Sequence, residues 1–485
     1  MTKSAEYHCP PQANGKEQKV GRPESQETYL AWLFILSFPE GKGNLMKIYR
    51  FSILFMFICI VFETSLSSLN AGESTSVDNS LDTIHSSSML DPRFFEHEHL
   101  LDFRRRNILE SKGFTLDMVF TSDFVTNHSG GLKKAGSGVD TSISYLANTD
   151  LVAELDTEKA GFWKGGIFHA HFFNHHGANP SEDKIGDLQF VDNIESEETT
   201  KMYELWYEHT FDLDDGDLSM LIGQHDLNSE FIITEYGLLF LQSSFGINSE
   251  IANNIQVSNF PVAALGFRIK WQPTDSLYLM AEISDGNPGK NNGGFDWKLD
   301  GKEGFVSFYE IGYNFGNQDD SRTMPGTYKF GWWYHSADFD DVRDTDEYDE
   351  PLQHDGNYGI YFIADQMLFP GEGERGLGAF LQVGGVPDDR NQVDFYIGGG
   401  IHYRGIIPSR ERDILGLGVA HSSISEDLRD VEDVDSHETA VELTYRAKIF
   451  PWLAVQPGLQ VVFNPGADSS LNNAVVSLFR FQINF

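Results

Sequence analysis

Charged, amide and aromatic side chains recur at every second position of several segments. In 201–209 and 437–449, carboxylates, basic groups and a tryptophan alternate with apolar or aromatic residues. Successive side chains of a strand point to opposite faces, so each such segment has one polar face. Carboxylates, amides and guanidinium groups hydrogen-bond to sugar hydroxyls, and aromatic rings pack against the sugar ring. The candidates for a weak, multi-site sugar path are Arg268, Lys329, Arg404, Arg446, Glu204, Glu208, Glu442, Asp365, Trp206 and Trp333, although each could instead be ordinary solvated lining.

A histidine-rich segment, FHAHFFNHH (168–176), offers a second kind of chemistry. His169 and His171 share a strand face and could begin a metal site. No cysteine and no further ligand at a fixed spacing accompanies them, so we expect wall lining and predict no metal or cofactor. The chain also has no GxSxG, HExxH, Walker loop or GxGxxG leading into a helix, and we predict that it is not an enzyme.

The C-terminal segment 476–485 (VSLFRFQINF) shows which way such strands face. Its apolar face carries Phe479, Phe481, Ile483 and Phe485, and its polar face carries Arg480, Gln482 and Asn484. This pattern fits a transmembrane barrel, whose outside is lipid and whose inside is water, although a sandwich strand is the alternative. A chain that ends on an aromatic residue of such a strand resembles the assembly signal of bacterial outer-membrane proteins. We therefore expect the outer-membrane assembly machinery as a partner.

Strand-like segments with this alternation recur along the chain. We predict strands at 114–124, 141–156, 165–175, 201–211, 217–225, 262–272, 275–285, 303–315, 326–338, 356–368, 376–386, 392–404, 413–423, 437–449, 452–464 and 475–485. An even number suits a barrel with both ends on one side of the membrane. The connections mostly alternate between short and long, with 387–391 as an exception. The fold expected is all-β: a 16-stranded antiparallel transmembrane β-barrel.

One long connection, 226–261, is too apolar for a loop in water. It contains FIITEYGLLFLQSSFG (231–246). We expect this third external loop to fold inward and narrow the lumen. The alternative is a loop that contacts lipid or a second copy of the chain.

The N-terminal part reads as a targeting region. Basic residues in 46–50 precede the apolar run 51–62, so 46–71 is predicted to be a signal peptide cleaved near Ala71. We expect 1–45 to be an overextended start or a disordered leader, with a genuine cytoplasmic leader as the alternative. Residues 72–113 are expected to form a periplasmic segment with a short helix, and 114–485 to form the barrel.

The composition excludes other classes. No run of about 18 apolar residues is present that could form a membrane-spanning helix. Both cysteines, Cys9 and Cys59, lie in the part expected to be absent, so no disulfide is predicted. The formal net charge is −38, and −39 without residues 1–71, which argues against nucleic-acid binding. The acids cluster in 181–198, 338–350 and 425–435, which are either solvated loops or a negative mouth that attracts cations.

From about residue 101 to 485 the chain resembles the carbohydrate-selective porin family (OprB type). The matching motifs include MYELWYEH (202–209), IGQHDLNSEF (222–231) and the long stretch 385–425. The resemblance implies an outer-membrane barrel that passes monosaccharides and similar sugars through a narrow eyelet. It also implies an arginine in an FxRxG pattern where this chain has Gln382, which adds Gln382 to the candidates and suggests an altered sugar preference. Asn228 likewise replaces an acid common in the family.

Three functions therefore remain open at this level. The first is a passive, sugar-selective porin of the bacterial outer membrane. The second is a general or cation-preferring porin, and the third is a secreted, soluble carbohydrate-binding β protein. The expected partners are small sugars, outer-membrane lipid and lipopolysaccharide, and the assembly machinery. A second copy of the chain, in a homo-oligomer, is a further candidate partner, and nucleic acid is not expected.

Overall fold

The computed structural model describes residues 98–100, 106–134, 138–289, 293–295, 297, 303–316 and 324–485. These belong to the compact unit Ser86–Phe485. The predicted leader 1–45 and the predicted signal peptide 46–71, with its cleavage point at Ala71, lie outside the described residues.

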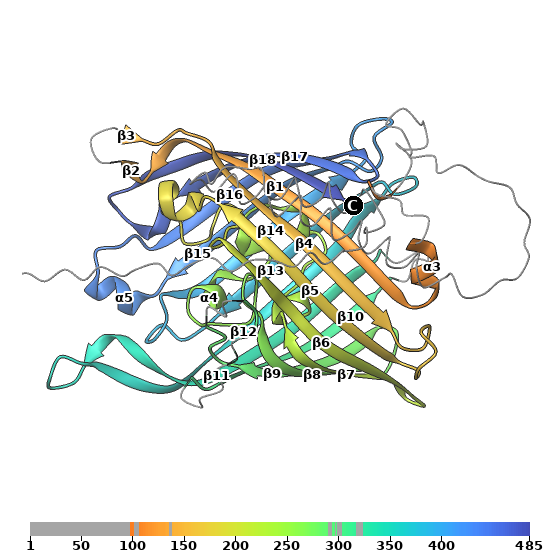
Figure 1. Ribbon diagram of the computed structural model, residues 1–485. Coiled ribbons are helices and arrows are strands. Elements are labelled where there is room, and N and C mark those ends of the chain that lie inside the picture. Colours follow the sequence, from red (N-terminus) through yellow and green to blue (C-terminus); the bar gives the residue numbers. More distant parts are fainter. Residues whose placement is uncertain are drawn as a thin grey trace, which may run out of the picture. The chain divides into compact units, whose positions relative to one another are not determined.

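The strands form one closed antiparallel barrel in which neighbours in the chain are neighbours in the sheet (Figure 1). The first strand pairs with both the second and the last, which closes the ring. The sixteen strands are β1 (Phe114–Gly131), β4 (Ser144–Asp156), β5 (Gly166–Gly177), β6 (Thr199–Leu213), β7 (Gly216–His225), β8 (Ala264–Gln272), β9 (Leu277–Asp285), β10 (Phe305–Phe315), β11 (Gly326–Thr345), β12 (Pro351–Pro370), β13 (Gly376–Gly385), β14 (Val393–Arg404), β15 (Ile414–Ile424), β16 (His437–Phe450), β17 (Leu453–Phe463) and β18 (Asn472–Asn484).

Every predicted segment corresponds to one of these strands, so the predicted barrel is confirmed. The largest difference is at β11 and β12, where the predicted long loop 339–355 is mostly a paired extension of the two strands. Phe339 pairs with His354, and Asp340 pairs with Gln353. Acidic side chains do not prevent pairing here, because the backbone groups bond across the hairpin while the carboxylates remain solvated.

Short helices lie in the connections and at the N-terminal side of the barrel. They are α3 (Arg106–Ser111), η2 (Ser181–Ile185), η3 (Leu227–Ser229), η4 (Gly237–Leu239), η5 (Ser243–Phe245), α4 (Ser249–Ala252), α5 (Glu426–Val431) and η6 (Pro465–Ala467), and a small hairpin joins β2 (Lys133–Lys134) to β3 (Gly138–Val139). The expected N-terminal helix is α3, where Arg106 Nη1 donates to the Phe485 carbonyl at 3.2 Å. Among the described helices, none has the length and hydropathy needed to cross a membrane.

The two faces of the wall differ as the alternation predicts. Phe479, Phe330 and Ile360 are 38%, 46% and 55% exposed on the outer face. Arg480, next to Phe479 in β18, points inward and is bonded to Asp123. Exposed aromatic and aliphatic side chains around the outside suit hydrocarbon, and enclosed polar groups suit a water-filled interior. This arrangement contradicts the alternative of a soluble β protein.

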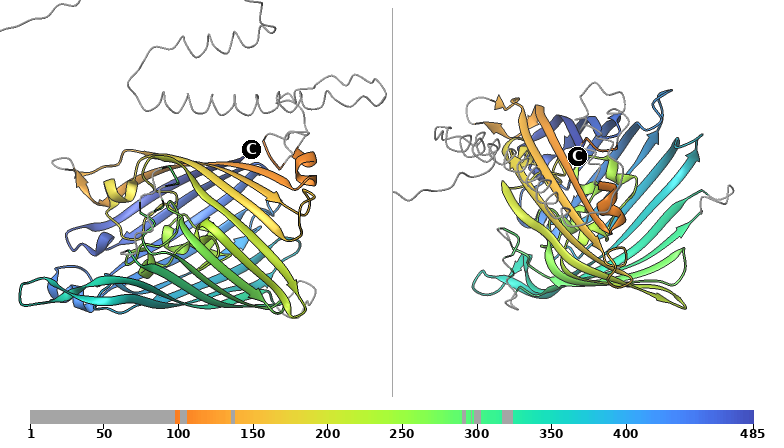
Figure 2. Two further views of the ribbon diagram at one scale, coloured as in Figure 1. Left: turned by 60° about the horizontal axis from the view of Figure 1, so that its bottom comes forward. Right: turned by 45° about the vertical axis from the view of Figure 1, so that its right-hand side comes forward.

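The third external loop, 226–263, folds into the barrel as predicted (Figure 2). Leu227, Phe231, Leu241 and Ile251 are 0% exposed because they pack against the inner wall and one another. The apolar content of 231–246 is thereby removed from water, which is the main source of stabilisation for a folded-in loop.

The second external loop, 178–198, folds inward as well, which differs from the expectation of a solvated acidic loop. Its Ile185, Val191 and Asp192 are each 0% exposed. The Asn193 N–H donates to the Leu241 carbonyl at 2.7 Å, and the Ser243 N–H donates to the Phe190 carbonyl at 3.0 Å. The two loops therefore form one inner plug that narrows the lumen.

Candidate permeation pathway

Carboxylates of the inner wall hold the third loop by its backbone. Glu442 on β16 accepts hydrogen bonds from the N–H groups of Leu241 and Gln242, each at 2.9 Å. Asp365 on β12 accepts from the N–H groups of Glu235 and Tyr236 at 3.1 and 3.2 Å. Two of the predicted lumen residues therefore anchor the constriction.

Two more wall carboxylates, which are not among the candidates, also accept hydrogen bonds from the backbone of the inward loops. Glu438 accepts from the N–H groups of Leu188 and Gln189 at 2.8 and 3.1 Å, and so holds the second loop. Glu310 accepts from the hydroxyls of Tyr278 and Tyr361 at 2.7 and 2.8 Å beneath the third loop. The strand alternation already places both carboxylates on the inner face, but it does not reveal which of them would meet a loop.

Arg268 and Glu208 lie together on the inner face of β8 and β6. Arg268 Nη2 contacts Glu208 Oε1 at 2.9 Å and Glu230 Oε1 of the third loop at 2.6 Å. Arg268 is only 2% exposed. This network joins the wall to the loop and largely neutralises the arginine.

Trp333 and Gln382 are buried beneath the loop and do not face water. Trp333 is 1% exposed and its ring stacks on Phe308, with centroids 6.2 Å apart. Gln382 is 0% exposed, and its Nε2 donates to the Phe245 carbonyl at 3.4 Å. Both side chains lie between the barrel wall and the third loop, and so shape the constriction without facing the water of the lumen.

The remaining basic candidates lie on β11, β14 and β16 and retain partial exposure. Arg446 Nη2 donates to Gln482 Oε1 at 2.5 Å, and its charge is repelled by the nearby Arg404 and Arg480. Arg404 makes one long contact, 3.4 Å, to Glu374. Lys329 on β11 donates to the Ile233 carbonyl at 2.8 Å. Lys448, which is not among the candidates, adds a further positive charge beside Arg446.

Acidic groups line the side of the barrel across from Arg404. Asp150 and Glu154 on β4 and Glu204 and Glu208 on β6 all point inward. In the closed ring of sixteen strands, β6 and β14 are eight strands apart and so lie on opposite sides. The inward carboxylates of β4–β6 form what we call the acidic wall, and Arg404 and Arg446 on β14 and β16 form the basic wall; β6 and β14 lie directly opposite each other.

Trp206 is the aromatic candidate that stays partly exposed within the acidic wall. Its ring stacks on His169 with centroids 4.4 Å apart and planes at 3°. Its Nε1 donates to Glu204 Oε1 at 3.4 Å. The ring is thus held flat beside carboxylates, an arrangement that suits a sugar ring and its hydroxyls.

Several carboxyl groups of the inward loops are buried enough to hold protons near neutral pH. Burial and the charge of Asp187 raise the pKa of Glu195 to about 8. Burial also raises the pKa of Glu250 to about 8. Burial, together with the charge of Glu204, raises the pKa of Asp226 to about 7. The plug therefore carries less negative charge at neutral pH than its sequence suggests.

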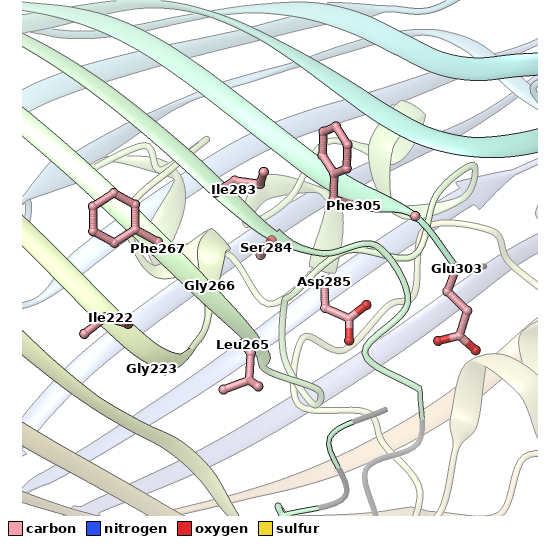
Figure 3. A pocket seen from close by; sticks show the side chains of 11 residues that line it. Ile222, Gly223, Leu265, Gly266, Phe267, Ile283, Ser284, Asp285, Glu303 and Phe305 are labelled. Atoms are coloured by element: carbon pink, nitrogen blue, oxygen red, sulfur yellow. The ribbon is translucent and has the colours of Figure 1, made fainter. Parts of the chain in front are cut away.

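A pocket of about 550 Å³ lies on the outer face, away from the lumen (Figure 3). Its lining includes Ile222, Phe267 and Ile283, which are 61%, 41% and 47% exposed on the lipid-facing side. Because these side chains point outward, the pocket is separate from the permeation pathway.

A closed barrel with an apolar exterior, a polar interior and an inward constriction defines a porin of the bacterial outer membrane. The family model "Carbohydrate-selective porin, OprB family" matches residues 140–485. The chain belongs to this carbohydrate-selective porin family.

Individual relatives agree with this assignment. Porin B of Pseudomonas aeruginosa is 26% identical over 420 residues, which span 79% of this chain and 89% of that protein. The high-pH structure of Pseudomonas putida OprB superposes with a TM-score of 0.73 at 22% identity, covering 81% of this chain and all of the other. The low-pH structure of the same porin gives a TM-score of 0.52 at 18% identity, covering 80% and 99% of the two chains. Members of this family are channels.

Proposed function

We propose that sugars pass between the acidic and basic walls, beside the two inward loops, by passive diffusion. The observation that carries this proposal is the opposition of Glu208 on β6 to Arg404 on β14, eight strands away. A cation is held at one wall and an anion at the other, whereas a neutral polyol exchanges hydration for weak contacts with both.

The candidates divide into two proposed roles. Those with partial exposure contact the sugar: Trp206, Glu208, Lys329, Arg404 and Arg446. The buried candidates support the third loop and so determine the size and shape of the opening that this loop leaves in the lumen. They are Arg268, Glu204, Glu442, Asp365, Trp333 and Gln382. Gln382 is proposed to relax the sugar preference, because an amide lacks the charge and the fork of donors of an arginine.

Single-channel recording of the full chain in planar bilayers tests this function. We expect glucose or a maltodextrin to lower the conductance in a saturable way at millimolar concentration. Arg446→Gln should weaken the block, because it removes donors from the basic wall. Conductance that does not respond to any of a panel of sugars would contradict the proposal.

A cation-preferring channel is the second candidate, and the net charge of −38 favours it. The acidic residues of the β11–β12 extension supply charge at the external end, where they would concentrate cations. Reversal potentials in a salt gradient separate the two candidates. A strong cation preference without sugar block would favour the second.

We further propose that the mature chain begins after Ala71 and that lipopolysaccharide and lipid surround the barrel. The strand ending at Phe485 is proposed to be recognised by the assembly machinery. We also propose that the chain has no catalytic activity, and that copies of the chain associate into a homo-oligomer through the lipid-facing wall. The N-terminal mass of purified protein, and the yield of folded barrel after deletion of Phe485, test the first and third points. Cross-linking in native membranes tests the oligomer.

A further inference from the structure

Two histidines and a glutamate converge on one point of the acidic wall. His169 and His171 point inward from β5, and Glu204 points inward from β6, where it is the register partner of His171. One potential ligand atom from each lies within 4.8 Å of the others. Glu204 Oε2 is 3.7 Å from His169 Nε2 and 3.3 Å from His171 Nδ1.

These separations match the edges of a metal tetrahedron. With zinc–nitrogen and zinc–oxygen bonds of about 2.0–2.2 Å, ligand atoms at tetrahedral angles are about 3.3–3.6 Å apart. The two edges that Glu204 makes with the histidines are therefore near the values that a zinc ion requires.

The other nitrogen of each histidine already has a carboxylate partner. His169 Nδ1 is 3.0 Å from Glu154 Oε1, and His171 Nε2 is 2.9 Å from Asp150 Oδ1. A ligating histidine usually donates its second ring N–H to a carboxylate, which fixes the tautomer and turns the free nitrogen toward the metal. Both histidines have this arrangement, and the second ring nitrogen of each points toward Glu204, where His171 Nδ1 makes a hydrogen bond of 3.3 Å to Oε2.

The remaining contacts of Glu204 are made by its other oxygen, Oε1. Its Oε1 accepts from the Asp226 N–H at 3.0 Å and from Trp206 Nε1 at 3.4 Å. Its Oε2 faces the two histidines. His169 Nε2 is buried and has no hydrogen-bond partner among the described residues, so a network of hydrogen bonds alone leaves this nitrogen unsatisfied.

We propose that His169, His171 and Glu204 bind a divalent transition-metal ion in the wall of the lumen, with zinc as the expected ion. Imidazole ligands select zinc and its neighbours over calcium and magnesium, which prefer oxygen. Asp150, Glu154 and Glu204 supply three negative charges that compensate the ion. Two of the three ligands come from the H-x-H segment, and the third comes from the neighbouring strand, so the sequence alone did not reveal the full set.

Zinc binding by the full chain in detergent, after chelator treatment, tests the site by calorimetry. We expect one zinc ion per chain, with a loss of at least about tenfold in affinity for His171→Gln or Glu204→Gln, and about 10–100-fold for Asp150→Asn. His176→Gln is the matched control, because His176 lies on the same strand but on the outer face; its binding should equal that of the unsubstituted chain. An unsubstituted chain without saturable zinc binding, or a His171→Gln variant that binds equally well, would overturn the proposal.

Cobalt(II) gives a second readout that needs no variant. A four-coordinate site of nitrogen and oxygen ligands should give the unsubstituted chain strong visible absorption, and zinc should displace it. Weak absorption of the six-coordinate type would contradict the proposed site. Heat-modifiable migration on gels verifies that each variant has folded, and the sugar block is measured separately, so failure of the sugar-channel function leaves the metal result interpretable.

Discussion

Arg480, on the last strand, donates hydrogen bonds to both carboxylate oxygens of Asp123, on the first strand, at 2.9 and 2.6 Å. The two residues are also register partners in the pairing of β18 with β1. Arg480 Nη2 reaches Asp192 of the second loop at 3.0 Å. One buried guanidinium therefore joins the closing seam of the barrel to the inner plug.

The first prediction concerns this seam. Asp123→Asn should destabilise the barrel by about 1.5–3 kcal/mol, because Arg480 loses its charged hydrogen bonds to Asp123 and keeps only Asp192 as a carboxylate partner among the described residues. The effect is measured as the temperature to which a sample must be heated before its gel band shifts from the position of the folded barrel to that of the unfolded chain. The control is Lys164→Gln, which removes an exposed pair with Asp212 and should leave that temperature unchanged. Equal behaviour of the two variants would contradict the role assigned to Asp123.

The second prediction concerns the loop anchor on β16. Glu442→Ala should increase both conductance and current noise, because the N–H groups of Leu241 and Gln242 lose their acceptor, at about 1–3 kcal/mol each. Single-channel recordings measure both quantities. Val441→Ala, on the outer face of the same strand, is the matched control and should conduct like the unsubstituted chain. Unchanged recordings for Glu442→Ala would show that other contacts suffice to hold the loop.

The third prediction concerns Gln382. Gln382→Arg should narrow the range of sugars that block the channel, because it adds a charged, multi-donor group beside the constriction. The carboxyl of Glu250 occupies the space next to Gly384, on the same face of β13, and could take up the new charge. Block constants for a panel of sugars measure the change, with Gln382→Met as the uncharged control of similar length. Identical block constants for the unsubstituted chain, Gln382→Arg and Gln382→Met across the sugar panel would contradict this prediction.

The fourth prediction concerns pH. The folded-state pKa values of Glu195 and Glu250 are raised to about 8 by burial, above the value of about 4.5 expected in the unfolded chain. The native state thus binds more protons between these values, so the stabilising contribution of both groups falls as pH rises from about 4.5 to about 8. We expect the plug to loosen, and conductance and noise to increase, between pH 5 and pH 9.

Glu250→Gln provides the comparison for that pH dependence. A neutral amide at this position does not titrate, so the variant should show a smaller change in conductance between pH 5 and pH 9. The same change in both proteins would assign the effect to other groups.

The strands and their two faces could be predicted from the sequence because alternation with period two is a local property of each segment. Phe479 outside and Arg480 inside follow directly from their adjacency, and so do Trp332 at 39% and Trp333 at 1% exposure on β11. The inward third loop was also predictable, because 231–246 is too apolar to remain in water. Alternation could not distinguish an inner side chain that faces water, such as Trp206, from one that lies under a loop, such as Trp333.

The sequence by itself determined the number of strands, the faces of the wall and the inward third loop, because these depend on side chains close together in the chain. Only the tertiary structure decided that the acidic second loop is buried, since its position depends on Arg480 and Glu438, far away in sequence. It alone also set Glu204 against His169 and His171, because the register of β6 against β5 shifts beside His171 and is determined by pairing between separate strands.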